Sequence, residues 1–117
     1  MSLMLWRRAV PAAAALLLCL TGGARADLSN AEFLGAFSGR VVGIGTACQV
    51  DKDRVLDLTK RAFAEINRGA VSKSDAGNAT SLFAEGVNSG SAEIGTGKTS
   101  CAAGTRAFED VEHTLPR

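Results

Sequence analysis

The spacing of apolar residues after residue 28 predicts helices rather than strands. In the first segment apolar side chains recur every three or four residues, on one face of a helix: Phe33, Phe37, Val41, Ile44 and Cys48. Ser29 and Glu32 have the capping-box spacing, in which each side chain satisfies a free N–H group at a helix start. We therefore predict a helix beginning at Ser29, with its apolar stripe, Cys48 included, turned toward a core.

A stripe of small residues lies on roughly the opposite face of this predicted helix. It contains Gly35, Gly39 and Gly43. Small side chains let another backbone approach closely, although each Gly costs a helix up to about 1 kcal/mol relative to Ala. Two interpretations are open: an interaction face for a partner protein or a second subunit, and close packing against the protein's own helices.

Three further segments have helical spacing. We expect one helix from an N-cap at Asp51 to a stop at Gly69 in the left-handed conformation, and another from Ser72, weakened by Gly86 and Gly90. The last runs from Thr99 or Ser100 to Pro116. Their apolar faces are Val55, Leu58, Ala62 and Ile66; Ala76, Ala79, Phe83 and Val87; and Cys101, Phe108, Val111 and Leu115. The pattern predicts an all-α fold, a small four-helix domain over residues 27–117.

The first 26 residues have the three parts of a cleavable signal peptide. Arg7 and Arg8 supply the positive region, and about a dozen mostly apolar residues follow. That stretch is shorter than the roughly 20 residues that span a bilayer. Ala24 and Ala26 supply the small residues before a cleavage site, so the mature chain is expected to begin at Asp27. The sequence thus predicts a periplasmic or secreted protein with no stable membrane anchor after cleavage.

Two cysteines remain after cleavage, Cys48 and Cys101, because Cys19 leaves with the signal peptide. In an oxidising compartment they most simply form one disulfide between the end of the first helix and the start of the last. Such a bond is worth roughly 4 kcal/mol in the chain-entropy model. Two free thiols or an intermolecular bridge are the alternatives.

Charge and motifs exclude several function classes. Cleavage leaves 10 basic and 12 acidic residues, a net charge of −2 that gives no basic footprint for nucleic acid. Residues 92–99 loosely fit a phosphate-binding loop, but no predicted strand precedes them, so we expect a Gly/Thr loop. His113 is the only histidine, which argues against a His/Cys metal site. No cofactor is predicted.

The layout resembles the HdeA-type acid-stress chaperones of the bacterial periplasm, which are small helical proteins with two cysteines about fifty residues apart. The resemblance is carried by Thr46-Ala47-Cys48, by residues 63–67 and by Cys101 at the head of the last helix. The chain lacks that family's Trp near the first Cys and its Lys-rich tail. It is similar as well to other small exported bacterial helical proteins of unknown function. The chaperone resemblance implies that acid would expose Phe-lined faces to unfolded clients.

These observations together predict a non-catalytic exported binding or interaction protein, chaperone-like in one version. Its expected partner is an unidentified protein or a second copy of the chain. The alternatives are a small envelope or stress protein with a structural role, and a small hydrolase using His113. We do not expect an enzyme, because no catalytic constellation accompanies the single histidine.

Overall fold

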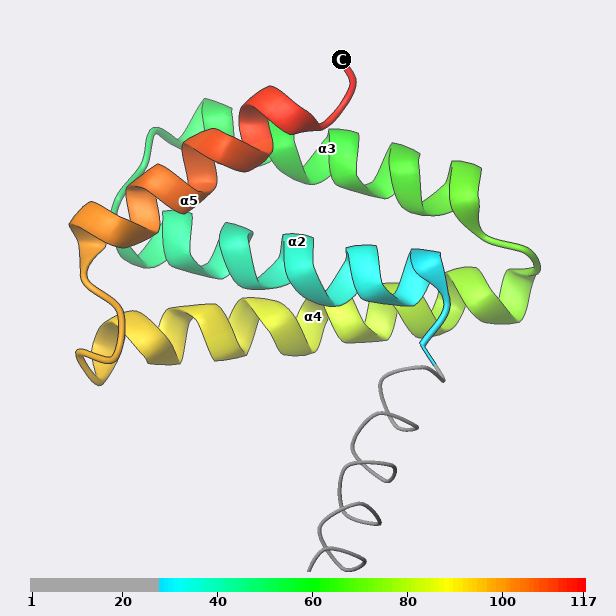
Figure 1. Cartoon of the computed structure of the whole chain (residues 1–117), viewed down its shortest axis with the longest axis horizontal. Helices are drawn as coiled ribbons and strands as arrows, with labels where there is room; N and C mark the ends of the chain where they lie inside the picture. Colours follow the sequence, from blue (N-terminus) through cyan, green and yellow to red (C-terminus); the bar gives the residue numbers. More distant parts are fainter. Residues whose placement is uncertain (1–27) are drawn as a thin grey trace, which may run out of the picture.

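The computed structural model describes residues 28–117, which form four helices and their connections (Figure 1). Their bounds are α2 Asn30–Ala47, α3 Lys52–Gly69, α4 Lys73–Gly95 and α5 Cys101–Thr114. No strand occurs among these residues. The prediction of an all-helical fold with four helices is confirmed for the described residues. The predicted signal peptide over residues 1–26 lies outside them.

Helix α2 is the centre of the arrangement (Figure 1). Its most extensive packing is with α4, on one side, while α3 and α5 lie on the other side. α3 runs antiparallel to α2. α4 runs in the same direction as α2, as shown by Gly35 facing Ala79 and Gly43, two turns later, facing Val87. A single central helix therefore positions the other three.

The glycine stripe of α2 is the surface on which α4 packs. A Cβ atom on Gly35, Gly39 or Gly43 would collide with a backbone carbonyl of α4. The three carbonyls belong to Ala79, Phe83 and Val87. The stripe therefore packs closely against another helix of the same chain, which was the second interpretation. Within the described residues, the three glycines form no exposed interaction face.

Helix α4 contributes small residues of its own to the same contact. A Cβ atom on Gly86 would meet the backbone at Ala36 and Arg40, and one on Gly90 would meet the Arg40 carbonyl. Although these glycines lower helix propensity, α4 is the longest of the four helices, with 23 residues. Close backbone packing against α2 thus outweighs the low helix propensity of Gly86 and Gly90.

The helix starts predicted from the sequence agree with the structure better than the predicted helix ends do. Ser29 and Glu32 form both hydrogen bonds of the capping box. Asp51 is the N-cap of α3, but its side chain makes no cap hydrogen bond. The left-handed stop predicted at Gly69 is wrong: Gly69 is the last helical residue, and the left-handed residues described are Gln49 and Gly97.

Candidate functional site

The apolar stripe of α2 is covered over only half its length. Val41 and Ile44 are fully buried, and α5 packs over this half, with Gly104 against the Ile44 side chain. Phe33 and Phe37, in the N-terminal half, are 62% and 42% exposed. The prediction that the whole stripe faces the core is therefore wrong for these two phenylalanines.

The exposed half exists because α5 is short and ends after Thr114. In Figure 1 the C-terminus lies near the middle of the long axis of the bundle, so the N-terminal turns of α2 extend beyond α5. Phe33 and Phe37 stack with nearly parallel rings, at an interplanar angle of 4° and a centroid distance of 6.2 Å. They form an apolar ridge next to the end of α5.

A groove of about 300 Å³ lies between this ridge and the last turn of α5. Its lining is mostly apolar and comes from two helices: Leu34, Phe37 and Ser38 of α2, with Asp110, Val111, Thr114 and Leu115 at the end of α5. We call this feature the α2–α5 groove. Together with the adjoining ridge it forms an apolar site of the kind that receives a partner's side chains.

Ser38 gives the groove its one buried orphan polar atom. The residue is fully buried, and its hydroxyl has no hydrogen-bond partner in the described part of the chain. A buried hydroxyl without a partner costs roughly 1–3 kcal/mol. No feature of the sequence singled out Ser38 or the groove, because both depend on where α5 ends.

Two arginines of α3 fix the end of α5 that forms the groove wall. Arg61 is 8% exposed and donates from Nη1 to the carbonyl oxygens of Glu112 and Leu115, each at 3.0 Å. Arg54 binds the Glu112 carboxylate through two hydrogen bonds of 3.0 and 2.6 Å, and this holds the pKa of Glu112 below its usual value. The groove wall is therefore anchored rather than loosely docked.

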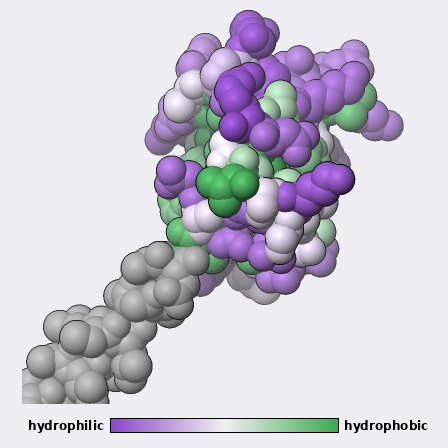
Figure 2. All heavy atoms as spheres, turned by 90° about the vertical axis from the view of Figure 1, so that its right-hand side faces the viewer, coloured by the Kyte–Doolittle hydropathy of each residue, from purple (hydrophilic) through white to green (hydrophobic). Residues whose placement is uncertain are grey.

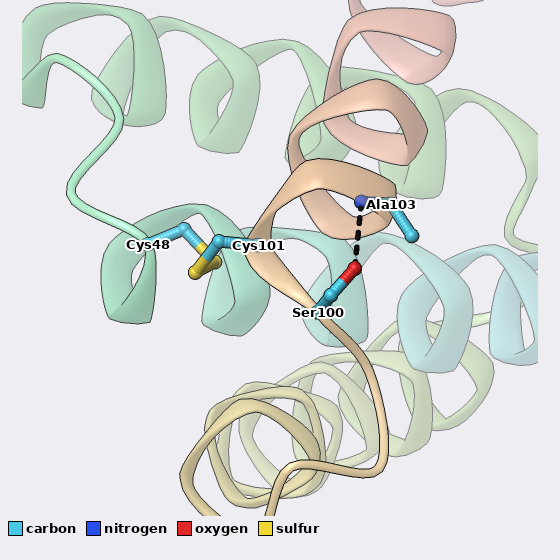
Figure 3. The surroundings of a disulfide bond; sticks show 4 residues. All are labelled: Cys48, Ser100, Cys101 and Ala103. Carbon is cyan, nitrogen blue, oxygen red and sulfur yellow. Dashed lines mark hydrogen bonds between the residues drawn. A yellow bond between two sulfur atoms is a disulfide. The ribbon is translucent and has the colours of Figure 1, made fainter.

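The other end of α5 is tied to α2 by the disulfide between Cys48 and Cys101 (Figure 3). Their Cα atoms are 5.4 Å apart, within the usual range for a disulfide. Ser100 caps the helix there, its hydroxyl accepting from the Ala103 N–H at 3.2 Å. The bond itself agrees with the sequence interpretation, but Cys101 is exposed, so the expectation that both cysteines lie on buried faces is wrong.

The segment that resembled a phosphate-binding loop is the end of α4 and its cap. Gly97, with φ 78°, follows the helix in the left-handed conformation, and its N–H donates to the Ile94 carbonyl. Glu93 accepts from the Arg40 guanidinium at 2.6 and 2.7 Å and from the Thr99 hydroxyl at 2.8 Å. These bonds, Arg40 first, lower the pKa of Glu93 to about 2. The segment serves to join α2, α4 and the connection to α5.

His113 lies on α5 beside an open, charged depression. The other residues lining it are Asp53, Arg54, Asp57, Glu109, Glu112 and Arg117. Among the described residues, no serine, threonine or cysteine lines this depression. Nor does any group of three or more His, Cys, Asp or Glu residues in this part of the chain have the geometry of a metal site.

The end of the bundle formed by the start of α2 and the α3–α4 connection is mostly hydrophilic, with small apolar spots (Figure 2). Asp75 joins the two segments: it accepts from the Ser29 hydroxyl at 2.5 Å and from the Val71 N–H at 3.0 Å. These two bonds lower the pKa of Asp75. Val71 is 86% exposed, but isolated apolar side chains are normal on protein surfaces.

Comparison with known proteins finds no match: no family model, no curated protein and no solved structure is similar to this chain. Among the described helices, none is long and apolar enough to cross a membrane.

Proposed function

We propose that this chain is an exported, non-catalytic binding protein whose α2–α5 groove and Phe33–Phe37 ridge hold apolar segments of other proteins. The export part of the proposal is supported by the N-terminal sequence pattern and by the disulfide, which suits an oxidising compartment. The binding part is supported by the apolar site itself.

One observation carries the binding proposal: two stacked phenylalanines remain exposed beside an apolar groove. Of the other three phenylalanines, Phe83 and Phe108 are buried, at 8% and 0% exposure, and Phe63 is half-buried. Leaving Phe33 and Phe37 in water forgoes roughly 25 cal/mol for each Å² of apolar surface that burial would remove. A partner that covers them recovers this free energy, which is the usual basis of apolar recognition.

The exposure of the Phe33–Phe37 ridge also indicates the pH at which the protein binds its clients. Phe33 and Phe37 are accessible with the Arg40–Glu93 and Arg54–Glu112 ion pairs formed, so binding needs no acid-induced opening. This version differs from the acid-activated chaperone implied by the family resemblance. We therefore expect client binding at neutral pH.

The test is suppression of client aggregation, measured by light scattering with an unfolded model protein at neutral pH and at pH 2–3. The variant Phe33→Ser removes the more exposed ring and is expected to reduce suppression at neutral pH. Leu56→Ser is the matched control, because Leu56 is 54% exposed but lies on α3 and belongs neither to the groove nor to the stacked Phe33–Phe37 ridge. Equal activity of the two variants, or no suppression by the wild-type chain at neutral pH, would refute the proposal.

A further inference from the structure

The charge around the α2–α5 groove restricts what it can bind. Asp110 is the one charged side chain lining the groove, and it forms no ion pair with any other residue that the structure describes. Glu109, one residue earlier, lines the depression beside His113 instead, so the acidic edge of the groove is Asp110 alone. Because no basic side chain lines the groove, a positively charged group would find an unpaired carboxylate there.

The C-terminal half of the apolar face of α2 is covered by a helix of the same chain, α5. α5 lies antiparallel on that face, with Gly104 against Ile44 and Phe108 against Gly45. Phe33 and Phe37, one turn apart, continue this same stripe past the end of α5. A second helix, with apolar side chains three or four residues apart, would therefore be received in the same way as α5.

The exposed apolar area of the Phe33–Phe37 ridge is too small for a stable dimer with a second copy of the chain. The exposed fractions of Phe33 and Phe37 add up to about one whole phenylalanine side chain, which is about 200 Å². A stable protein interface buries about 800 Å² on each partner. The ridge thus supports a short, reversibly bound segment better than a symmetric dimer.

We propose that the α2–α5 groove binds a short amphipathic helix of another protein, whose apolar side chains cover the Phe33–Phe37 ridge and whose Lys or Arg pairs with Asp110. This inference rests on the proposed binding function and adds the class of partner: helical, apolar on one face and basic at its edge. The acidic edge of the groove disfavours an anionic membrane surface, because like charges repel.

The test uses two synthetic helical peptides with identical apolar faces, one with Lys and one with Glu on the flanking positions. A third peptide has the Lys composition with a scrambled apolar face. Fluorescence anisotropy of the labelled peptides is expected to show the Lys peptide binding about two- to fivefold more tightly than the Glu peptide, the size of a partly exposed ion pair. Asp110→Asn is expected to abolish this preference, and Phe33→Ser to weaken both peptides. The scrambled peptide is expected not to bind.

The outcomes separate this inference from the function on which it rests. Equal binding of both peptides, unchanged in Asp110→Asn, overturns the basic-partner inference but leaves apolar binding standing. No binding of either peptide, with no suppression of client aggregation, overturns both. A dimer in sedimentation that Phe33→Ser converts to a monomer assigns the ridge to a second copy and overturns the inference. Binding to phosphatidylglycerol vesicles that Phe33→Ser abolishes overturns it in favour of a membrane.

Discussion

Gly39 in α2 lies against the backbone of Phe83 in α4, so closely that a Cβ atom on Gly39 would sit 2.8 Å from the Phe83 Cα. The same atom would collide with the Phe83 carbonyl oxygen, which belongs to a helix backbone and cannot move aside alone. This contact sets the separation of the two helices. It also explains why glycine, a poor helix former, recurs at this spacing in α2.

Gly39→Ala is accordingly expected to destabilise the fold by about 2–3 kcal/mol, as overpacking forces the helices apart. Gly77→Ala is the matched control in α4, because a Cβ atom there meets nothing within 4 Å. The control is expected to stabilise the fold by about 0.5–1 kcal/mol through backbone entropy and helix propensity. Urea unfolding followed by circular dichroism measures both. Equal shifts in the two variants would contradict the packing assigned to Gly39.

The sequence located the close approach at Gly35, Gly39 and Gly43 without identifying the neighbour. Spacing shows where a backbone can come near, but α4 is recognised as the partner only when Gly86 and Gly90 are seen to face α2. The capping box at Ser29 was easier to predict, because both of its hydrogen bonds form within one turn.

The candidate site was not predicted, and the reason is the length of α5. The helical spacing that relates Phe33 and Phe37 to Val41 is correct, since α2 is one continuous helix from Asn30 to Ala47 and the two rings stack. Which part of that face is covered depends on a helix more than 50 residues later, which ends at Thr114. A local pattern carries no information about that distant end, so the spacing predicts a buried face where Phe33 and Phe37 are exposed.

A second prediction concerns the C-terminal cap of α2, where Gln49 adopts the left-handed conformation with φ 61°. The Gln49 N–H donates to the Thr46 carbonyl and the Val50 N–H to the Gly45 carbonyl, the pattern of a Schellman motif. That motif favours glycine, since a side chain costs about 1 kcal/mol there. Gln49→Gly is expected to raise the unfolding free energy by about 0.5–1 kcal/mol.

Gly97→Ala provides the opposite change at the equivalent position after α4, where φ is 78°. It is expected to lower the unfolding free energy by about 1 kcal/mol. Thermal unfolding of the two variants tests the pair. A lower melting temperature for Gln49→Gly would contradict the conformation described for this cap.

The disulfide between Cys48 and Cys101 makes a third prediction. Replacing both cysteines by serine is expected to lower the unfolding free energy by about 4 kcal/mol, because the bond closes a loop with a sequence separation of 53 residues. Adding a thiol reductant to the wild-type chain should give a similar loss, since Cys101 is exposed. A reduced chain as stable as the oxidised one would show that the bond adds nothing.

The Arg40–Glu93 pair makes a fourth prediction, on the dependence of stability on pH. The arginine and Thr99 lower the pKa of folded Glu93 from 4.5 to about 2. A carboxylate with a depressed folded pKa contributes stability that is complete above its unfolded pKa and is lost as pH falls. The contribution of Glu93 should therefore decline between about pH 4.5 and pH 2.

Its size is on the order of 1 kcal/mol, because Arg40 is 38% exposed and water screens the pair. Glu93→Gln is expected to flatten the stability profile within this pH window. Glu85→Gln, at an exposed position of the same helix, is the control and should leave the profile unchanged. Parallel profiles for wild type and Glu93→Gln would contradict the assignment.

Ser38 makes the last prediction, because its hydroxyl is buried without a hydrogen-bond partner beside the α2–α5 groove. Ser38→Ala removes the unsatisfied atom and raises helix propensity, so it is expected to stabilise the fold by about 1 kcal/mol. Ser81→Ala, at an exposed position inside α4, isolates the propensity effect and should add only about 0.5 kcal/mol or less. A Ser38→Ala variant less stable than wild type would mean that the hydroxyl has a partner in solution. The groove would then contain no unpartnered polar atom, while the exposed Phe33–Phe37 ridge would be unaffected.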